Sequence, residues 1–256
     1  MRTGSLLFAA FTASVVLAAG EQAGKPNVII LFIDDQGTLD ANCYGSTDLI
    51  TPNIDKLATT GIRFTQAYAH VVCCPSRAAL LTGRHPQRGG VDRWTQGDRH
   101  GADSQNTNMA ATEVTLAEVL SEAGYNTVHI GKWHMGDIRE AWPNYQGFDY
   151  AAFPIHQQGQ LTIFHDDAAD EEVSIGIGDN NYDDRYTMDR WLRTDASSMV
   201  TGVEGFRDQP VREVHMQPGE RWNEAKYHEM NVRYQQQTME QLRELAQADE
   251  PFFLQY

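Results

Sequence analysis

The chain has 256 residues, of which 41% are hydrophobic and 10% aromatic, as is ordinary for a globular protein. Its net charge of −15, with no basic stripe, tells against a nucleic-acid partner and gives no long-range attraction for a polyanion. Recognition of an anion must therefore come from a local positive site. Only three cysteines occur, so the fold is not a disulfide scaffold.

The first twenty residues predict a signal peptide. Arg2 supplies a positive start, residues 6–17 are mostly apolar, and residues 18–20 are small, as at a cleavage site. The apolar run is short for a membrane span, which favours removal and no stable membrane insertion. We expect an exported protein, periplasmic or extracellular.

Residues 28–33 form a continuous apolar, β-branched run, which predicts a central parallel strand buried on both faces. Asp34 and Asp35 follow it directly. Ligands collect at the carboxyl ends of strands in open α/β folds, and carboxylate oxygens suit Ca²⁺ or Mg²⁺. On these two residues alone, a plain acidic turn remains an open alternative.

Helices and strands alternate along the chain, which predicts an α/β architecture. A helix is expected from Thr51 to Gly61, another over 114–123, and a strand over 127–130. A long charged helix is expected over 223–248, and a buried strand at 251–256. The apolar positions expected on or near one face of the long helix are Met230, Tyr234, Met239 and Leu242.

The run from residue 160 to residue 222 has a different composition. It is polar, acidic and rich in Asp, Gly and Asn, so we expect a surface insertion with little core. Asp179 and Asn180 lie within it and are interpreted as solvated loop residues rather than metal ligands.

Residues 73–84 read CCPSRAALLTGR and predict a helix that begins at Cys73 and ends in a left-handed cap at Gly83. Cys73 would then lie at a helix N-terminus, where unpaired N–H groups stabilise negative charge. Arg77, one turn into the helix, points back toward that end. The alternative is a buried cysteine pair that opens a core helix.

Residues 131–136 read GKWHMG and follow the strand predicted at 127–130. A lone Lys or His is usually a surface or core residue. Here Lys132 and His134 share a glycine-flanked turn directly after a strand, which favours a site role for both.

The three segments together resemble the motifs of the type I sulfatases of the alkaline phosphatase superfamily: Asp-Asp-x-Gly, Cys-x-Pro-Ser-Arg and Gly-Lys-Trp-His-x-Gly. The resemblance implies an α/β fold with a mostly parallel central sheet flanked by helices. It also implies that Cys73 is oxidised to Cα-formylglycine, the nucleophile. Asp34, Asp35 and residue 73 would then bind a divalent metal, Ca²⁺ or possibly Mg²⁺, and Arg77 would orient the hydrated aldehyde.

In the same resemblance Lys132 neutralises sulfate oxygens, His134 hydrogen-bonds the hydrated formylglycine, and His156 lies in a stretch that borders the substrate. The implied reaction is hydrolysis of sulfate esters, on aryl sulfates or sulfated carbohydrates, small or polymeric. The implied partner is a formylglycine-generating maturation enzyme. A phosphonate or phosphodiester hydrolase of the same superfamily is an open alternative.

The length of the chain leaves open a further alternative to an active enzyme. Residues 26–256 read as the N-terminal portion of a sulfatase catalytic domain, because the chain stops within an apolar strand before the distal metal ligands that the resemblance implies. A non-catalytic, truncated fragment therefore remains open.

Overall fold

The computed structural model describes residues 24–91, 108–136, 138–154, 163–166, 171–174, 200–220 and 224–256. The helices are α1 (Pro52–Thr60), α2 (Cys73–Thr82), α3 (Leu116–Glu122) and α5 (Glu224–Leu245). The strands are β1 (Val28–Ile30), β2 (Asn126–Ile130), β3 (Tyr150–Phe153), β4 (Ile163–Asp166), β5 (Glu171–Ser174), β6 (Val200–Phe206), β7 (Arg212–His215) and β8 (Phe252–Gln255).

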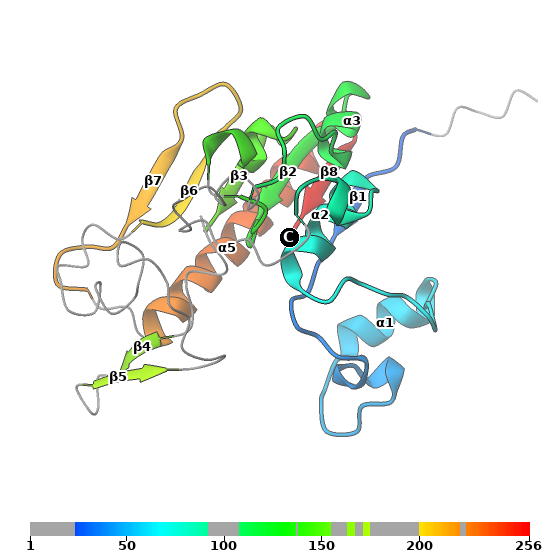
Figure 1. The fold of residues 1–256 in the computed structure, drawn as a ribbon. Helices are drawn as coiled ribbons and strands as arrows, with labels where there is room; N and C mark the ends of the chain where they lie inside the picture. The colour runs from blue at the N-terminus through cyan, green and yellow to red at the C-terminus, as the bar shows by residue number, and fades with distance from the viewer. Residues whose placement is uncertain are drawn as a thin grey trace, which may run out of the picture.

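A six-stranded sheet in the order β1-β8-β2-β3-β6-β7 forms the centre of the described structure (Figure 1). The strands β1, β8, β2 and β3 pair in parallel, whereas β6 and β7 continue the sheet antiparallel. Because parallel strands end at one edge, the segments after β1 and β2 emerge at the same edge, on either side of β8. Backbone bonds join the ends of β1 and β8: Tyr256 N donates to Ile30 O at 2.9 Å, and Phe32 N to Tyr256 O at 2.8 Å.

Two hydrophobic cores cover the two faces of the sheet. Helices α2 and α3 pack on one face against Phe253 of β8, together with Trp133 and Phe148. Helix α5 packs on the other face through Met230 and Tyr234. Adjacent residues of β8 alternate between the two cores, which makes β8 the fully buried strand of the described sheet.

Four local expectations are confirmed: α2 and its left-handed cap at Gly83 (φ 62°), β2, α5 and β8 all form where the sequence predicts them. The face of α5 is only partly as predicted, since Met239 is exposed. Among the described residues no helix is long and apolar enough to cross a membrane.

The prediction of a central, doubly buried strand at 28–33 is wrong. Strand β1 spans 3 residues and ends the strand order of the described sheet. Ile29, Leu31 and Ile33 are 48%, 58% and 54% exposed. A continuous apolar run does not reveal whether a strand has one neighbour or two, and here β8 is the neighbour that the described residues supply.

The prediction of a surface insertion with little core is wrong for residues 200–216. Strand β6 pairs with β3, Val203 is fully buried in the core with Phe153, and Met216 packs against α5. The polar composition misled because β7 exposes most of its side chains. Residues 175–199, including Asp179 and Asn180, lie outside the described part.

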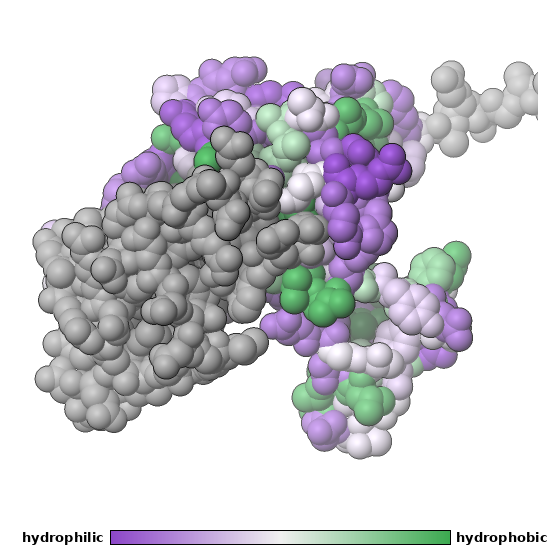
Figure 2. Space-filling view, viewed as in Figure 1, coloured by the Kyte–Doolittle hydropathy of each residue, from purple (hydrophilic) through white to green (hydrophobic). Residues whose placement is uncertain are grey.

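Helix α1 stands apart from the sheet and contributes no buried residue (Figure 1). It packs within its own small unit: Asn42 N donates to Thr51 Oγ1 at 2.9 Å, and Cys43 N to Asp55 Oδ1 at 2.8 Å. Figure 2 shows hydrophobic residues on the surface of this unit, and Ile50 and Ile62 are among the exposed ones. The apolar side chains of α1 therefore belong to neither of the two hydrophobic cores.

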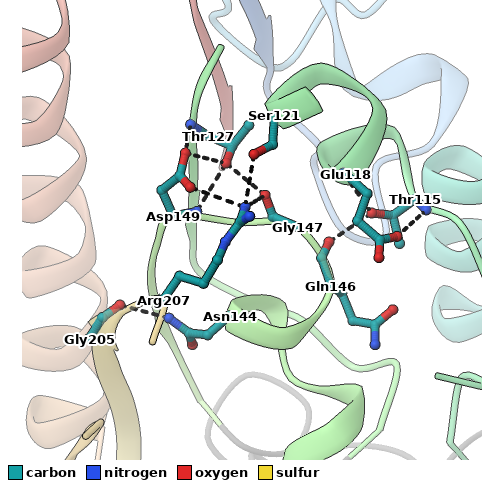
Figure 3. A network of polar contacts seen from close by, with 10 residues as sticks. All are labelled: Thr115, Glu118, Ser121, Thr127, Asn144, Gln146, Gly147, Asp149, Gly205 and Arg207. Carbon is teal, nitrogen blue, oxygen red and sulfur yellow. Dashed lines mark hydrogen bonds and ion pairs between the residues drawn. The ribbon is translucent and has the colours of Figure 1, made fainter. Parts of the chain in front are cut away.

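A polar network fastens α3 and β2 to the turn before β3 (Figure 3). Thr127 Oγ1 donates to Gly147 O at 2.7 Å, and Arg207 donates to the same carbonyl while pairing with Asp149 at 3.1 Å. Thr115 caps α3 and also donates to Gln146 O at 2.7 Å. The turn thus lies directly against the first turn of α3.

That contact predicts a large effect for Gly147→Ala. Gly147 has φ +95°, and an added Cβ would lie 2.2 Å from the backbone N of Glu118. Neither backbone can give way, so we expect the free energy of unfolding to fall by about 3 kcal/mol or more. The measurement is urea unfolding followed by circular dichroism.

The matched control is Gly124→Ala. Gly124 also has a positive φ, +83°, but nothing lies within 4 Å of its added Cβ. Backbone strain alone should cost about 1–2 kcal/mol. If both variants lose the same free energy of unfolding, the close contact between the turn and α3 does not contribute to the effect of Gly147→Ala.

Candidate active site

Helix α2 brings Cys73 to the carboxyl edge of the sheet. Val72 precedes the helix in an extended conformation, Cys73 is its first residue, and Cys74 is fully buried against the core. The Ser76 hydroxyl donates back to Val72 O at 2.9 Å and steadies this first turn. Cys73 is half-buried, so its side chain is both held and accessible.

The turn at residues 131–136 is built on an irregular backbone. Gly131 and Gly136 have φ +98° and +144°, and His134 has φ +56°. Trp133 anchors the turn, since its Nε1 donates to Ala141 O at 2.7 Å in the core. Lys132 and His134, on either side of this anchor, are both buried: Lys132 reaches toward the segment after β1 and His134 toward the start of α2.

These elements bring the predicted residues together. Cys73 Sγ lies 3.2 Å from His134 Nδ1, and Lys132 forms an ion pair with Asp34. Residues separated by about sixty to a hundred positions thus meet in one place, as the strand order requires. Asp35 has φ +56°, so two of the described non-glycine residues with left-handed backbone, Asp35 and His134, belong to the predicted site. Such conformations concentrate at functional sites.

Arg77 has a different contact from the expected one. It is buried, its Nη1 donates to the carbonyl of Lys132 at 2.6 Å, and its guanidinium lies 5.0 Å from the centre of the Phe32 ring. Burial lowers the pKa of Arg77, and the negative groups Asp34 and Cys73 oppose that shift. In the described contacts Arg77 holds the backbone of the lysine turn.

The site stabilises negative charge at position 73. Its surroundings lower the pKa of the Cys73 thiol to about 3. Hydrogen bonding from Cys74 is the largest cause, and His134 and the charge of Lys132 add to it, while burial opposes them. An oxygen that becomes an anion at this position would gain from the same donors.

Asp34 and Asp35 are the candidate metal ligands. Their carboxylate oxygens fit Ca²⁺ or Mg²⁺ in chemical type. Ca²⁺ takes about six to eight oxygen ligands, and one oxygen of Asp34 is already paired with Lys132. The donor type therefore fits, whereas the described residues do not complete a coordination shell.

Sequence reasoning missed two residues of the site. Cys74, treated as a variable position, places its Sγ 3.3 Å from His134 Nε2. His129 is buried under the turn, its Nε2 lies 3.1 Å from Gly131 O, and burial lowers its pKa to about 3, so the ring is neutral. The signal for His129 was a histidine at an inward position of an apolar strand. His156 lies outside the described residues.

Comparison with known proteins identifies the family. The Sulfatase family model matches residues 26–256, nearly the whole chain after its first segment. The chain belongs to the sulfatase family. The segments 73–84 and 131–136 lie within the matched region.

Relatives support the assignment over part of their length. This sulfatase-family chain is 43% identical to human (Homo sapiens) arylsulfatase A over 159 residues, 59% of the chain and 30% of that protein. It is 42% identical over 143 residues to an N-acetylgalactosamine-6-O-sulfatase of Bacteroides thetaiotaomicron, 51% of the chain and 27% of that protein. The matched region thus spans less than a third of either relative.

Solved structures agree on the fold. The PsFucS1 sulfatase from Pseudoalteromonas sp. superposes with a TM-score of 0.66 at 27% identity, over 91% of this chain and 44% of that one. Ps i-CgsB, solved with k-i-k-neocarrahexaose, gives 0.59 at 27% identity, over 90% and 44%. The α/β fold with helices on both faces of the central sheet, as in the alkaline-phosphatase-like sulfatases, is confirmed.

Proposed function

We propose that this chain carries the nucleophile and the sulfate-binding lysine of a sulfuric ester hydrolase. The observation that carries the proposal is one turn, residues 131–136, that reaches two other motifs. Lys132 pairs with Asp34, and His134 contacts Cys73. Membership of the sulfatase family supports the same reaction class.

Cys73 is proposed to act after conversion to formylglycine by a maturation enzyme. When formed, the hydrated aldehyde would supply an oxygen nucleophile whose sulfate ester can be released as the aldehyde re-forms. Position 73 suits an anionic oxygen, because it opens α2 and lies beside His134 and Lys132.

His134 is proposed to control a proton at position 73. Its Nε2 faces Cys74 and its Nδ1 faces residue 73. A Cys74 thiol that donates to Nε2 leaves the ring proton on Nδ1, where it can be donated to an oxygen of residue 73. Cys74 would thereby set the tautomer of His134.

Lys132 is proposed to bind the sulfate oxygens of the substrate. Its ammonium group reaches the carboxyl edge of the sheet, where Asp34 holds it. A cation fixed there stabilises the charge that develops on the transferring group. Arg77 supports this geometry through the carbonyl of Lys132.

A divalent cation, Ca²⁺ or Mg²⁺, is proposed at Asp34, Asp35 and residue 73, where it would neutralise charge on the nucleophile and on sulfate. His156 is proposed as a substrate contact.

We further propose an exported protein with a signal peptide at residues 1–20. Its substrates would be aryl sulfates or sulfated carbohydrates, a class consistent with the names of the relatives.

The test compares two substrates and two forms of the protein. The longest native polypeptide containing this chain would be expressed with and without a maturation enzyme. We expect peptide mass spectrometry to show formylglycine at Cys73, not Cys74, and hydrolysis of an aryl sulfate only in the converted form. Faster cleavage of the matched aryl phosphonate, or equal activity without conversion, would contradict the proposal.

A further inference from the structure

Two thiol sulfurs and an imidazole nitrogen gather where α2 begins. Cys73 Sγ lies 3.2 Å from His134 Nδ1, and Cys74 Sγ lies 3.3 Å from His134 Nε2. One ligand atom from each of the three residues falls within 4.8 Å of the others. In the described part of the chain no other group of three His, Cys, Asp or Glu side chains meets this condition.

The surroundings favour a metal rather than solvated thiols. Cys74 and His134 are buried, whereas Cys73 is half-buried and leaves an approach from one side. The two cysteines are consecutive in the first turn of α2, and the rigid turn at 131–136 holds the imidazole beside them. Two ligands are thus fixed, and the third can rotate.

We propose that the chain with Cys73 unconverted binds one Zn²⁺ through Cys73, Cys74 and His134, with an exogenous ligand in the fourth position. Thiolate and imidazole ligands suit Zn²⁺ and not Ca²⁺. Two thiolates balance the charge of the ion, and each thiol that is protonated releases its proton on binding.

One cysteine must move to close the site, because Cys73 and Cys74 now lie beside different nitrogens of the same imidazole. Tetrahedral zinc holds sulfur at about 2.3 Å and nitrogen at about 2.0 Å, which puts its ligand atoms about 3.3–3.8 Å apart. The atoms now lie within 4.8 Å of one another. In the proposed site the half-buried Cys73 turns toward Nε2 of His134, where Cys74 already lies.

The proposal has a consequence that rests on the proposed function. Conversion of Cys73 to formylglycine removes one thiolate and leaves Cys74 and His134 as an incomplete pair. Position 73 would then face the carboxylates Asp34 and Asp35, which suit a hard cation. Zinc binding would therefore belong to the precursor alone.

The test uses the whole chain expressed without a maturation enzyme, with intact mass confirming the Cys73 thiol. Titration with Co²⁺ should give one bound ion per chain and a thiolate-to-cobalt charge-transfer band that Zn²⁺ abolishes. Cys73→Ser, Cys74→Ser and His134→Asn should each weaken binding by at least about 100-fold. Asn is chosen at 134 because it tolerates a positive φ.

Cys43→Ser is the matched control, since Cys43 lies in the α1 unit and should leave the titration unchanged. Circular dichroism checks that each variant folds, and Cys73→Ser, at a half-buried position, is the variant most able to do so. A cobalt band that persists in folded Cys73→Ser, or that vanishes in Cys43→Ser, would overturn the site.

The converted chain separates this inference from the proposed function. Co-expression with the maturation enzyme should yield formylglycine at 73 and a chain that has lost the cobalt band. A converted chain that still binds Co²⁺ with the affinity of the unconverted chain would contradict a role for Cys73 as a metal ligand. If Cys73 is never converted and the precursor binds cobalt as described, the proposed function fails and the zinc site stands.

Discussion

Cys73→Ala is expected to abolish sulfate ester hydrolysis, with kcat falling by at least about 10³-fold, because alanine cannot be converted to the formylglycine that is proposed as the nucleophile. The fold should survive. Cys73 is half-buried at the first position of α2, and Ala favours helix. The measurement is steady-state hydrolysis of an aryl sulfate by the matured polypeptide that contains this chain.

Cys43→Ala supplies the control for loss of a thiol elsewhere, and its kcat should equal that of the parent protein. Thermal melts of both variants should lie close to that of the parent. Residual activity in Cys73→Ala above one part in about 10² would mean that another group attacks sulfur. The assignment of residue 73 would then be wrong.

Lys132→Met is expected to lower kcat/KM for an aryl sulfate by about 10²-fold or more, because it deletes the cation that is proposed to bind the transferring group. A structural effect competes with this one. The side chains of Lys132 and Asp34 are only 6% and 21% exposed, so the variant leaves a carboxylate largely buried without its partner. Breaking such a pair can itself cost about 3–5 kcal/mol of stability.

A double variant separates the two effects. Lys132→Met with Asp34→Asn removes both charges, so we expect thermal stability to recover most of what Lys132→Met loses. Activity should stay as low as in the single variant or fall further, since Asp34 is also a proposed metal ligand. Recovery of kcat/KM together with stability would show that Lys132 only neutralises Asp34 and does not act on sulfate.

His134→Ala provides a comparison of a different kind. Its loss should impair turnover at residue 73 while leaving substrate binding closer to normal, so kcat should fall more than KM changes. The double variant His134→Ala with Lys132→Met should lower kcat/KM by less than the product of the two single fold-losses, because both residues are proposed to serve one reaction cycle. A fully multiplicative result would mean that the two side chains act independently.

The sequence by itself determined the local elements. The start of α2 at Cys73, its left-handed end at Gly83 and the glycine-flanked turn at 131–136 were all predictable. These features depend on the conformational preferences of Pro, Gly and their immediate neighbours, which act over a few residues. The motifs resembled lie on the same segments, so the candidate site residues were predictable except for Cys74 and His129, which only the structure placed there.

The tertiary structure alone decided which elements are neighbours. Strand β1 lies at the end of the described sheet order rather than in its centre, and the polar segment 200–216 adds strands beside β3. An apolar run favours burial but does not say how many strands pair with it, and a polar composition does not exclude pairing at a sheet edge.

The same limit applies within the site. Arg77 bonds to the carbonyl of Lys132, 55 residues away, and Cys74 contacts His134, 60 residues away. No pattern within a helix predicts either contact, because each depends on the packing that brings the turn after β2 beside α2. The sequence therefore determined which side chains could carry the chemistry, and the packing of the sheet against α2 decided which of them touch.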